Sequence, residues 1–172
     1  MKEPQERKKK TTNMSFRVGF GFDVHQLIEG KDFWLGGIKV EHYKGAVGHS
    51  DADVLIHAIC DALLGAANMR DIGFHFPDTS ATYKGIDSKI LLKDVLKLIR
   101  EAGYEVGNID STISLQKPKI NPHIPAMVTV LSEVMGIDEG QLSIKATTTE
   151  KLGYVGTEDG INAHAVVLIN KV

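Results

Sequence analysis

The chain has 172 residues, of which 42% are hydrophobic, and its formal net charge is -2. This length allows one domain with its own hydrophobic core and is too short for two ordinary domains. The balanced charge excludes a general basic surface for nucleic acid or an anionic membrane, and no apolar stretch is long enough to span a bilayer. We therefore expect a globular protein with no nucleic-acid and no membrane partner, in which any phosphate binding is local.

The chain begins with a charged segment, MKEPQERKKK, which has no apolar stretch and so fails the test for a secretory signal. We expect a basic, disordered tail over residues 1–14 and a single domain over residues 15–172. A contact with nucleic acid or a targeting role is the alternative for the lysines at 8–10. The only cysteine, Cys60, excludes an internal disulfide, so a reducing cytoplasm fits best.

Hydrophobic periodicity predicts strands and helices in alternation along the chain. The predicted strands cover residues 15–22, 33–40, 104–116, 142–147 and 161–169. The predicted helices cover residues 51–67, 88–103 and 121–136. Ser50 is the expected N-cap of the first helix and Asp87 or Ser88 that of the second, while Gly36-Gly37 indicates a bulge or turn in the second strand. These elements predict an α+β fold, an α/β sandwich whose mixed β-sheet carries about three helices on one face.

Two segments of this pattern bear on function. Residues 71–80 are rich in Gly, Asp and Pro, and such a segment is either a surface connector or a mobile flap over an active site. The last predicted strand is apolar on both faces, with Val166 and Leu168 opposite a face made of Ile161, Ala163, Ala165, Val167 and Ile169. We expect helices on one side and a neighbouring subunit or second layer on the other, and a central strand of a monomer is the alternative.

Asp23 and His25 stand two residues apart at the end of an apolar run, where the period of a strand points both side chains to one side. His57 lies in the first predicted helix and is the candidate third ligand. Two imidazoles and one carboxylate suit a catalytic zinc site that keeps a fourth position open for a substrate oxygen. Asp53 and Asp61 stand four residues on either side of His57, so either of them orients His57 or faces solvent. Polar capping of a strand is the alternative for Asp23 and His25 alone.

A second group of polar residues follows the strand predicted at 142–147. Three hydroxyls, at Thr147 to Thr149, can donate to phosphoryl oxygens, and Glu150 is a candidate ligand for magnesium or manganese. A purely structural strand edge is the alternative. Lys117 and Lys119 offer two cations on a turn stiffened by proline. The sequence has no Walker A motif and no complete dinucleotide fingerprint, which argues against the familiar nucleotide-binding folds.

Several of these motifs, in this order, resemble one enzyme family. They are Gly21 to His25, His49 to Ala58, Asp61 to Ala66, Asp71 to Gly73, Phe76 to Thr79 and Lys145 to Gly153. Together they closely resemble the 2-C-methyl-D-erythritol 2,4-cyclodiphosphate synthase family of the non-mevalonate isoprenoid pathway. The resemblance extends from about Phe16 to Val172, and only the tail before Met14 lies outside it.

The resemblance implies a homotrimer with active sites between adjacent subunits and a small-molecule substrate linked to cytidine diphosphate. The enzyme would be a phosphorus-oxygen lyase. It would convert 4-diphosphocytidyl-2-C-methyl-D-erythritol 2-phosphate to 2-C-methyl-D-erythritol 2,4-cyclodiphosphate and release CMP. The reaction would be a metal-assisted intramolecular attack of the 2-phosphate on the β-phosphorus.

The same resemblance implies roles for individual residues. Zn²⁺ would be bound by Asp23, His25 and His57, and a second divalent cation, Mg²⁺ or Mn²⁺, by Glu150 and the substrate phosphates. Transition-state stabilisation would come from His49 and Thr148. The erythritol and phosphate portion would contact Asp23, His25, His49, Ser50, Asp71, Ile72, Gly73, Phe76, Pro77, Asp78, Thr79 and Ser80. The cytidine nucleotide and its phosphates would contact Leu115, Gln116, Lys117, Pro118, Lys119, Ile120, Asn121, Thr147, Thr148, Thr149, Glu150 and Tyr154.

One stretch departs from the family pattern. Members often carry an Arg-Gly-Glu-Gly-like stretch after the aromatic position matched by Tyr154, whereas this chain has Thr157-Glu158-Asp159-Gly160. The arginine associated with anion binding in the central cavity of the trimer is therefore absent. This absence argues against the binding of downstream isoprenoid diphosphates there and leaves the expected active site unchanged.

Two other functions fit the same residues. A metal-dependent phosphohydrolase or phosphodiesterase would use the same Asp-His-His centre and would yield an open-chain phosphate. A non-catalytic nucleotide-binding or scaffold protein would hold a structural metal in a closed site with four protein ligands. His49, Thr148 and Glu150, present beside the three candidate ligands, argue against the scaffold protein.

Overall fold

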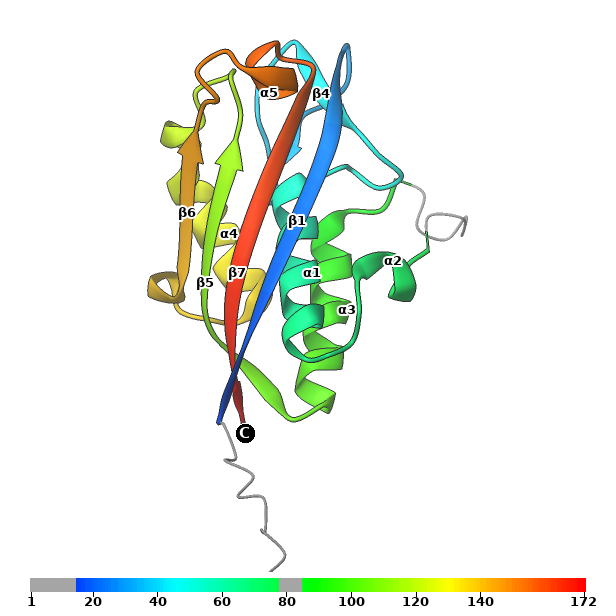
Figure 1. Cartoon of the computed structure of the whole chain (residues 1–172), viewed down its shortest axis with the longest axis vertical. Helices are drawn as coiled ribbons and strands as arrows, with labels where there is room; N and C mark the ends of the chain where they lie inside the picture. Colours follow the sequence, from blue (N-terminus) through cyan, green and yellow to red (C-terminus); the bar gives the residue numbers. More distant parts are fainter. Residues whose placement is uncertain (1–14, 78–84) are drawn as a thin grey trace, which may run out of the picture.

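The computed structural model describes residues 15–77 and 85–172, which form a layer of β-sheet backed by a layer of helices (Figure 1). The strands are β1 (Phe16–Glu29), β2 (Trp34–Leu35), β3 (Ile38–Lys39), β4 (Lys44–Val47), β5 (Tyr104–Ser114), β6 (Leu142–Thr147) and β7 (Gly160–Lys171). The helices are α1 (Val54–Ala66), α2 (Ile72–His75), α3 (Ser88–Glu101), α4 (Ile124–Met135) and α5 (Gly153–Gly156), with 3-10 turns η2 (Asn121–His123) and η3 (Glu139–Gln141).

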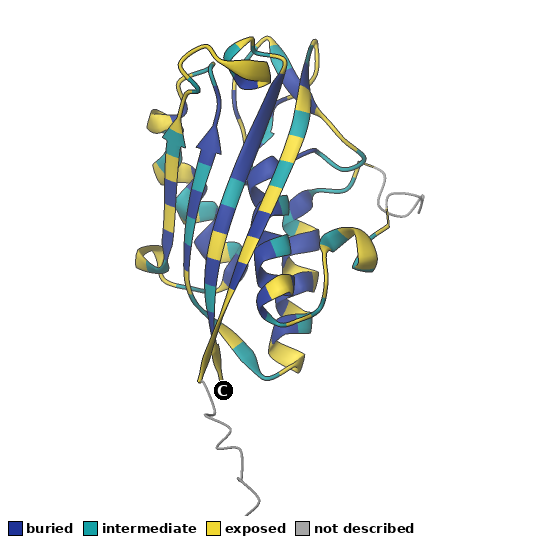
Figure 2. Ribbon diagram, viewed as in Figure 1, coloured by how far each residue is buried: buried dark blue, intermediate teal, exposed yellow. Residues whose placement is uncertain are grey.

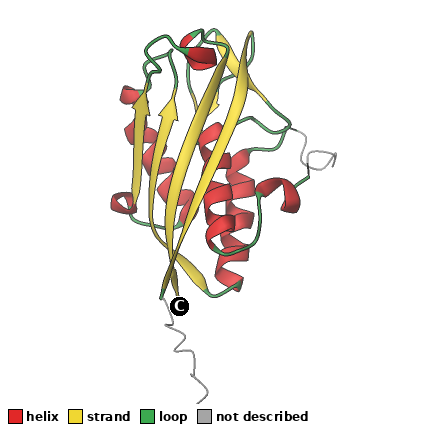
Figure 3. Ribbon diagram, viewed as in Figure 1, coloured by secondary structure: helices red, strands yellow, loops and turns green. Residues whose placement is uncertain are grey.

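The main sheet has five strands in the order β4-β1-β7-β5-β6. Strands β5 and β6 are parallel, and the other neighbours are antiparallel. The three long helices α1, α3 and α4 lie on one face of this sheet, as Figure 3 shows. The predicted α+β fold with a mixed sheet and helices on one face is therefore confirmed.

Strand β1 is longer than predicted. The sequence indicated a strand that ends at residue 22, but pairing with β7 continues to Gln26 and carries Asp23 and His25 inside the strand. Side chains along β1 alternate between the helix layer and the opposite face (Figure 2). Gly19 and Gly21 face α1, where a Cβ on Gly21 would lie 2.0 Å from the carbonyl oxygen of Ala58. The two glycines thus let strand and helix backbones approach more closely than side chains would permit.

The predicted strand over 33–40 is divided into the short strands β2 and β3. The turn predicted at Gly36-Gly37 is confirmed, because both glycines take positive φ angles between these two strands. Helix α1 begins three residues later than predicted, at Val54. The prediction of Ser50 as its N-cap is also wrong: Ala52 has a positive φ, and the cap is Asp53, whose carboxylate accepts from Ile56 N. Elsewhere the predicted boundaries agree with the structure to within a few residues.

Three short elements were not predicted: β4, α2 and α5. Strand β4 is only four residues long, and α2 lies within the segment predicted as a loop at residues 71–80. The predicted disordered tail, residues 1–14, lies outside the described residues. None of the described helices combines the length and apolar character that crossing a bilayer requires.

The central strand β7 confirms the two-sided pattern seen in its sequence. Its five alternating residues Ile161, Ala163, Ala165, Val167 and Ile169 are buried under the helices. On the opposite face, Val166 is 44% exposed and lies beside exposed apolar side chains of β1. Helices therefore cover only one face of the sheet, and the other face is open and partly apolar.

We predict that Gly21→Ala lowers the free energy of unfolding by about 2 kcal/mol or more, because the added methyl group would overlap the backbone of α1. Gly65→Ala is the matched control, since a Cβ there has no neighbour closer than 4.0 Å and lies within a helix. We expect that control to be neutral or more stable. Urea denaturation of both variants measures the difference, and equal stabilities would contradict close packing at Gly21.

Candidate active site

The structure brings the three predicted metal ligands together between β1 and α1. The carboxylate oxygen Oδ2 of Asp23 lies 2.9 Å from His57 Nδ1 and 3.0 Å from His25 Nε2. The two imidazole nitrogens are 3.1 Å apart. A tetrahedral zinc ion with bonds of about 2.0–2.1 Å separates its ligand atoms by about 3.3 Å, close to these three distances. The donor set and its spacing therefore fit zinc.

The second nitrogen of His25 fixes which atom faces the centre. Nδ1 of His25 lies 3.0 Å from the carbonyl oxygen of Val47, at the end of β4. A carbonyl only accepts, so Nδ1 carries a hydrogen and donates it, and Nε2 is the nitrogen that faces Asp23 and His57 and that would bind a metal through its lone pair. A metal-ligating histidine typically makes such a contact with its other nitrogen.

The electrostatics of the centre favour a cation. Burial opposes ionisation of Asp23, but hydrogen bonds from His25 and His57 and the charges of both rings hold the pKa of Asp23 well below its usual value. Burial likewise favours a neutral His57, yet the hydrogen bond and charge of Asp23 raise the pKa of His57 above its usual value. An ionised carboxylate thus lies between two basic rings, in an arrangement that a divalent cation would stabilise.

A cavity of about 380 Å³ opens beside these ligands. Besides Asp23 and His25, the predicted contact residues that line it are His49, Ser50, Ile72, Gly73 and Phe76. The described residues contain only three clustered metal-ligand side chains at this point, and the centre opens onto the cavity. This arrangement suits a catalytic metal with an exchangeable position and argues against a closed structural site.

Part of the predicted contact segment is placed differently. The carboxylate of Asp71 caps α2 by accepting from Phe74 N at 3.0 Å, and Asp71 does not line the cavity. Pro77 follows α2 and is exposed, also outside the residues that line the cavity. The candidate residues Asp78, Thr79 and Ser80 lie outside the described residues.

The residues predicted to hold the nucleotide form a second cavity, of about 370 Å³, at the ends of the parallel strands β5 and β6. The predicted residues that line it are Leu115, Gln116, Pro118, Lys119, Ile120, Asn121, Thr147 and Thr148. Four other residues predicted to contact the nucleotide do not line this cavity and have partners elsewhere in the chain. Lys117 pairs with Glu158, Thr149 donates to the carbonyl oxygen of Leu152, Tyr154 accepts from Asn162, and Glu150 accepts from the hydroxyl of Thr148.

Within one chain, Glu150 is not part of the metal-ligand cluster. It follows β6, whereas Asp23 and His25 are on β1, and β7 and β5 separate these two strands in the sheet. Among the described residues, the cluster consists of Asp23, His25 and His57 alone. In an isolated chain, Glu150 is therefore the only protein ligand predicted for the second cation.

The prediction that Asp53 or Asp61 orients His57 is wrong, because both carboxylates accept from backbone N–H groups and other side chains contact His57. The buried carboxylate of Asp53 accepts from the backbone of Gly36, Gly37 and Ile56, and that of Asp61 accepts from Ile72 N. The Nε2 atom of His57 instead lies 3.0 Å from the hydroxyl oxygens of both Ser50 and Ser88. Sequence spacing gave no sign of Ser88 at the site, because it lies 31 residues from His57.

Comparison with known proteins identifies the family of the chain. The model of the YgbB family matches residues 16–170 of the chain. The chain belongs to the YgbB family. This membership covers the sheet, the helices and both cavities described above.

Two relatives that match almost the whole chain carry the same name. The chain is 66% identical over 159 residues to the 2-C-methyl-D-erythritol 2,4-cyclodiphosphate synthase of Parabacteroides distasonis, covering 92% of this chain and 99% of the relative. It is 67% identical over 159 residues to the protein of that name from Bacteroides fragilis, covering 92% and 100%. These matches confirm the resemblance found in the sequence and the prediction of an enzyme, a lyase acting on phosphorus-oxygen bonds.

Solved structures share the YgbB fold. A 2C-methyl-D-erythritol-2,4-cyclodiphosphate synthase bound to CDP has a TM-score of 0.83 and 34% identity, covering 90% of this chain and 100% of that one. The IspF of Plasmodium falciparum in complex with CDP has a TM-score of 0.80 and 35% identity, covering 91% and 97%. The bifunctional IspDF of Campylobacter jejuni has a TM-score of 0.88 and 38% identity, covering 91% of this chain and 42% of that one.

We predict that the purified protein binds one zinc ion and that Asp23→Asn weakens this binding by about tenfold or more, because the charged ligand is lost. Equilibrium dialysis with elemental analysis measures the bound zinc. Asp110→Asn is the matched control, because this carboxylate pairs with Lys145 and is not part of the cluster. Zinc binding that is equal in the two variants would contradict the assignment of Asp23.

Proposed function

We propose that this chain converts 4-diphosphocytidyl-2-C-methyl-D-erythritol 2-phosphate to 2-C-methyl-D-erythritol 2,4-cyclodiphosphate and CMP in non-mevalonate isoprenoid biosynthesis. The observation that carries the proposal is the open Asp23, His25 and His57 cluster on a cavity, in a chain 66% identical to a synthase of that name. CDP complexes of structural relatives support a cytidine nucleotide in the second cavity. The buried free thiol of Cys60 supports the expected reducing cytoplasm.

The reaction is an internal displacement at phosphorus. An oxygen of the 2-phosphate forms a bond to the β-phosphorus, the bond from that phosphorus to the bridging oxygen breaks, and CMP leaves with the bridging oxygen. No water is consumed, so the protein must fold the substrate into line and keep water from the β-phosphorus. The cavity walls at Ile72, Gly73 and Phe76 would hold the erythritol portion against the metal centre and limit the entry of water.

Charge stabilisation is divided among the side chains and two cations. Zinc on Asp23, His25 and His57 would polarise the diphosphate, and Mg²⁺ or Mn²⁺ held by Glu150 and the phosphates would neutralise the leaving group. His49 lines the first cavity and Thr148 the second, where each would support the charge that develops in the transition state. Ser50 and Lys119 would bind substrate oxygens at the two cavities.

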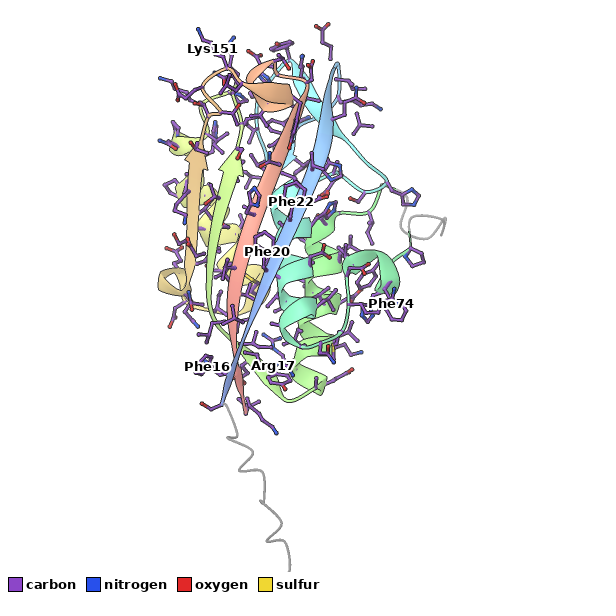
Figure 4. The ribbon with its side chains drawn as sticks, in the orientation of Figure 1. Phe16, Arg17, Phe20, Phe22, Phe74 and Lys151 are labelled. Carbon is purple, nitrogen blue, oxygen red and sulfur yellow. The ribbon has the colours of Figure 1, made fainter. Side chains whose placement is uncertain are left out.

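We also propose a homotrimer whose active sites lie between adjacent chains. The open face of the sheet exposes a group of large apolar side chains, three of which are labelled in Figure 4. These residues are Phe16, Val18, Phe20, Phe22, Val24 and Val166. Phe20 is 62% exposed. Contact of this large apolar side chain with water is unfavourable, and packing against a neighbouring copy would bury it. The metal centre and the nucleotide cavity are separate in one chain, and assembly would join the centre of one copy to the cavity of the next.

We predict that phosphorus NMR of the protein with the cytidylyl substrate shows the cyclic diphosphate and CMP, and that chelation abolishes both signals. Asp23→Asn should abolish turnover with the fold retained, because it removes a ligand at the surface of a cavity and no core packing. An open-chain phosphate would indicate a hydrolase instead, and no turnover in zinc-loaded wild-type protein would indicate a binding or scaffold protein.

We predict that Thr148→Ala slows turnover by roughly ten- to a thousandfold, because its hydroxyl acts mainly in the transition state. Refolding equal amounts of Asp23→Asn and Thr148→Ala chains together then tests the position of the active site. If each site combines Asp23 of one chain with Thr148 of the next, about a quarter of all sites in the randomly assembled mixture carry neither change and activity returns. The baseline is the residual activity of the Thr148→Ala chains, which make up half of the mixture. A mixture whose activity does not exceed this baseline would contradict active sites between subunits.

A further inference from the structure

We propose that Ser88, held by Asp51, is a positioning residue that orients His57 for metal binding. This inference rests on the proposed zinc centre and adds a hydroxyl and a carboxylate that stand behind the ligand. Ser88 is the first residue of α3 and is fully buried. It reaches His57 from a helix that supplies no ligand, so this contact would tie the start of α3 to the centre.

The carboxylate of Asp51 holds Ser88 at two points. Oδ2 of Asp51 accepts from the backbone N of Ser88 at 3.0 Å, and Oδ1 accepts from the hydroxyl of Ser88 in a short hydrogen bond. A serine hydroxyl has a single hydrogen, and an ionised carboxylate can only accept. The hydrogen of Ser88 is therefore directed at Asp51, and the oxygen presents its lone pairs to its other two neighbours, His57 Nε2 at 3.0 Å and the hydroxyl of Ser50 at 3.3 Å.

This arrangement complements the metal-bound form of His57. Nδ1 is the atom that faces Asp23 and His25, so a metal at the centre would be bound through Nδ1. A neutral imidazole bound through Nδ1 carries its hydrogen on Nε2, and that hydrogen needs an acceptor because the ring is largely buried. Ser88 supplies an acceptor already oriented by Asp51, and such outer contacts fix the ring and raise its basicity.

Ser50 also lies 3.0 Å from His57 Nε2, but its role differs. Its oxygen accepts from Ala52 N, it has no hydrogen bond to a carboxylate among the residues that the structure describes, and it lines the cavity where substrate would bind. Its hydroxyl hydrogen is therefore free to turn toward Ser88 or the cavity. Ser88 is the neighbour of Nε2 whose hydroxyl direction is fixed, so we assign the positioning role to it.

The test measures zinc affinity by competition with a chromogenic chelator in the full chain. We expect Ser88→Ala and Asp51→Asn each to weaken zinc binding by roughly 10- to 100-fold, the range typical of residues behind a metal ligand. Ser111→Ala is the matched control. It removes a buried hydroxyl that donates to the carbonyl oxygen of Ser143 in the sheet, and we expect its zinc affinity to match that of the wild type.

A second measurement separates positioning from a merely structural role. In the zinc-loaded wild-type protein, the Nε2 hydrogen of His57 should give a slowly exchanging NMR signal, and Ser88→Ala should speed its exchange. A structural role alone would lower the unfolding temperature of the metal-free protein and leave the zinc affinity and this signal unchanged. If Ser88→Ala fails to fold, Asp51→Asn carries the same two measurements.

The outcomes separate the inference from the proposed function. Zinc affinity within about twofold of wild type in both Ser88→Ala and Asp51→Asn would overturn the positioning role and leave the zinc centre intact. A wild-type protein that binds no zinc would overturn both the centre and the positioning role. Weakened binding in the two variants, with normal binding in Ser111→Ala, is the result that supports the inference.

Discussion

The close approach of the backbones of β1 and α1 is the constraint on which the site depends. Gly19 and Gly21 face the helix without side chains, and a Cβ on either would lie within 2.0 Å of a carbonyl oxygen of α1. The two-residue period of the strand then places Asp23 and His25 on the same side as the glycines. His57 immediately precedes Ala58, the helix residue that meets Gly21, so the strand carboxylate and the helix imidazole are brought to 2.9 Å.

The two imidazoles of the candidate metal site each contact an element that supplies none of its ligands. Val47 at the end of β4 accepts from His25, and Ser88 at the start of α3 lies against His57. The proposed metal centre lies beside β1, and the cavity proposed to bind the nucleotide lies at the ends of β5 and β6. In the proposed trimer, a neighbouring chain packed on the apolar face of the same sheet would bring the two together.

The clustering of the candidate metal ligands was predictable because their signals are local. A two-residue spacing in a strand and one histidine in an apolar helix identified Asp23, His25 and His57 without any knowledge of tertiary structure. The contacts of Val47 and Ser88 were not predictable, since they depend on which distant elements pack against each imidazole. The start of α1 was misplaced for a related reason, because its N-cap Asp53 is buried and accepts hydrogen bonds from the distant β2–β3 turn, a contact that the local sequence does not show. The nucleotide residues followed from the family resemblance, and the structure brings most of them to one cavity.

The most direct test of the account is a crystal structure of the zinc-loaded protein with anomalous scattering recorded at the zinc edge. The account predicts one strong peak at about 2.0–2.2 Å from Asp23 Oδ2, His25 Nε2 and His57 Nδ1, with a non-protein ligand in the fourth position. A peak bound by other residues, or a fourth protein side chain that closes the coordination sphere, would contradict it.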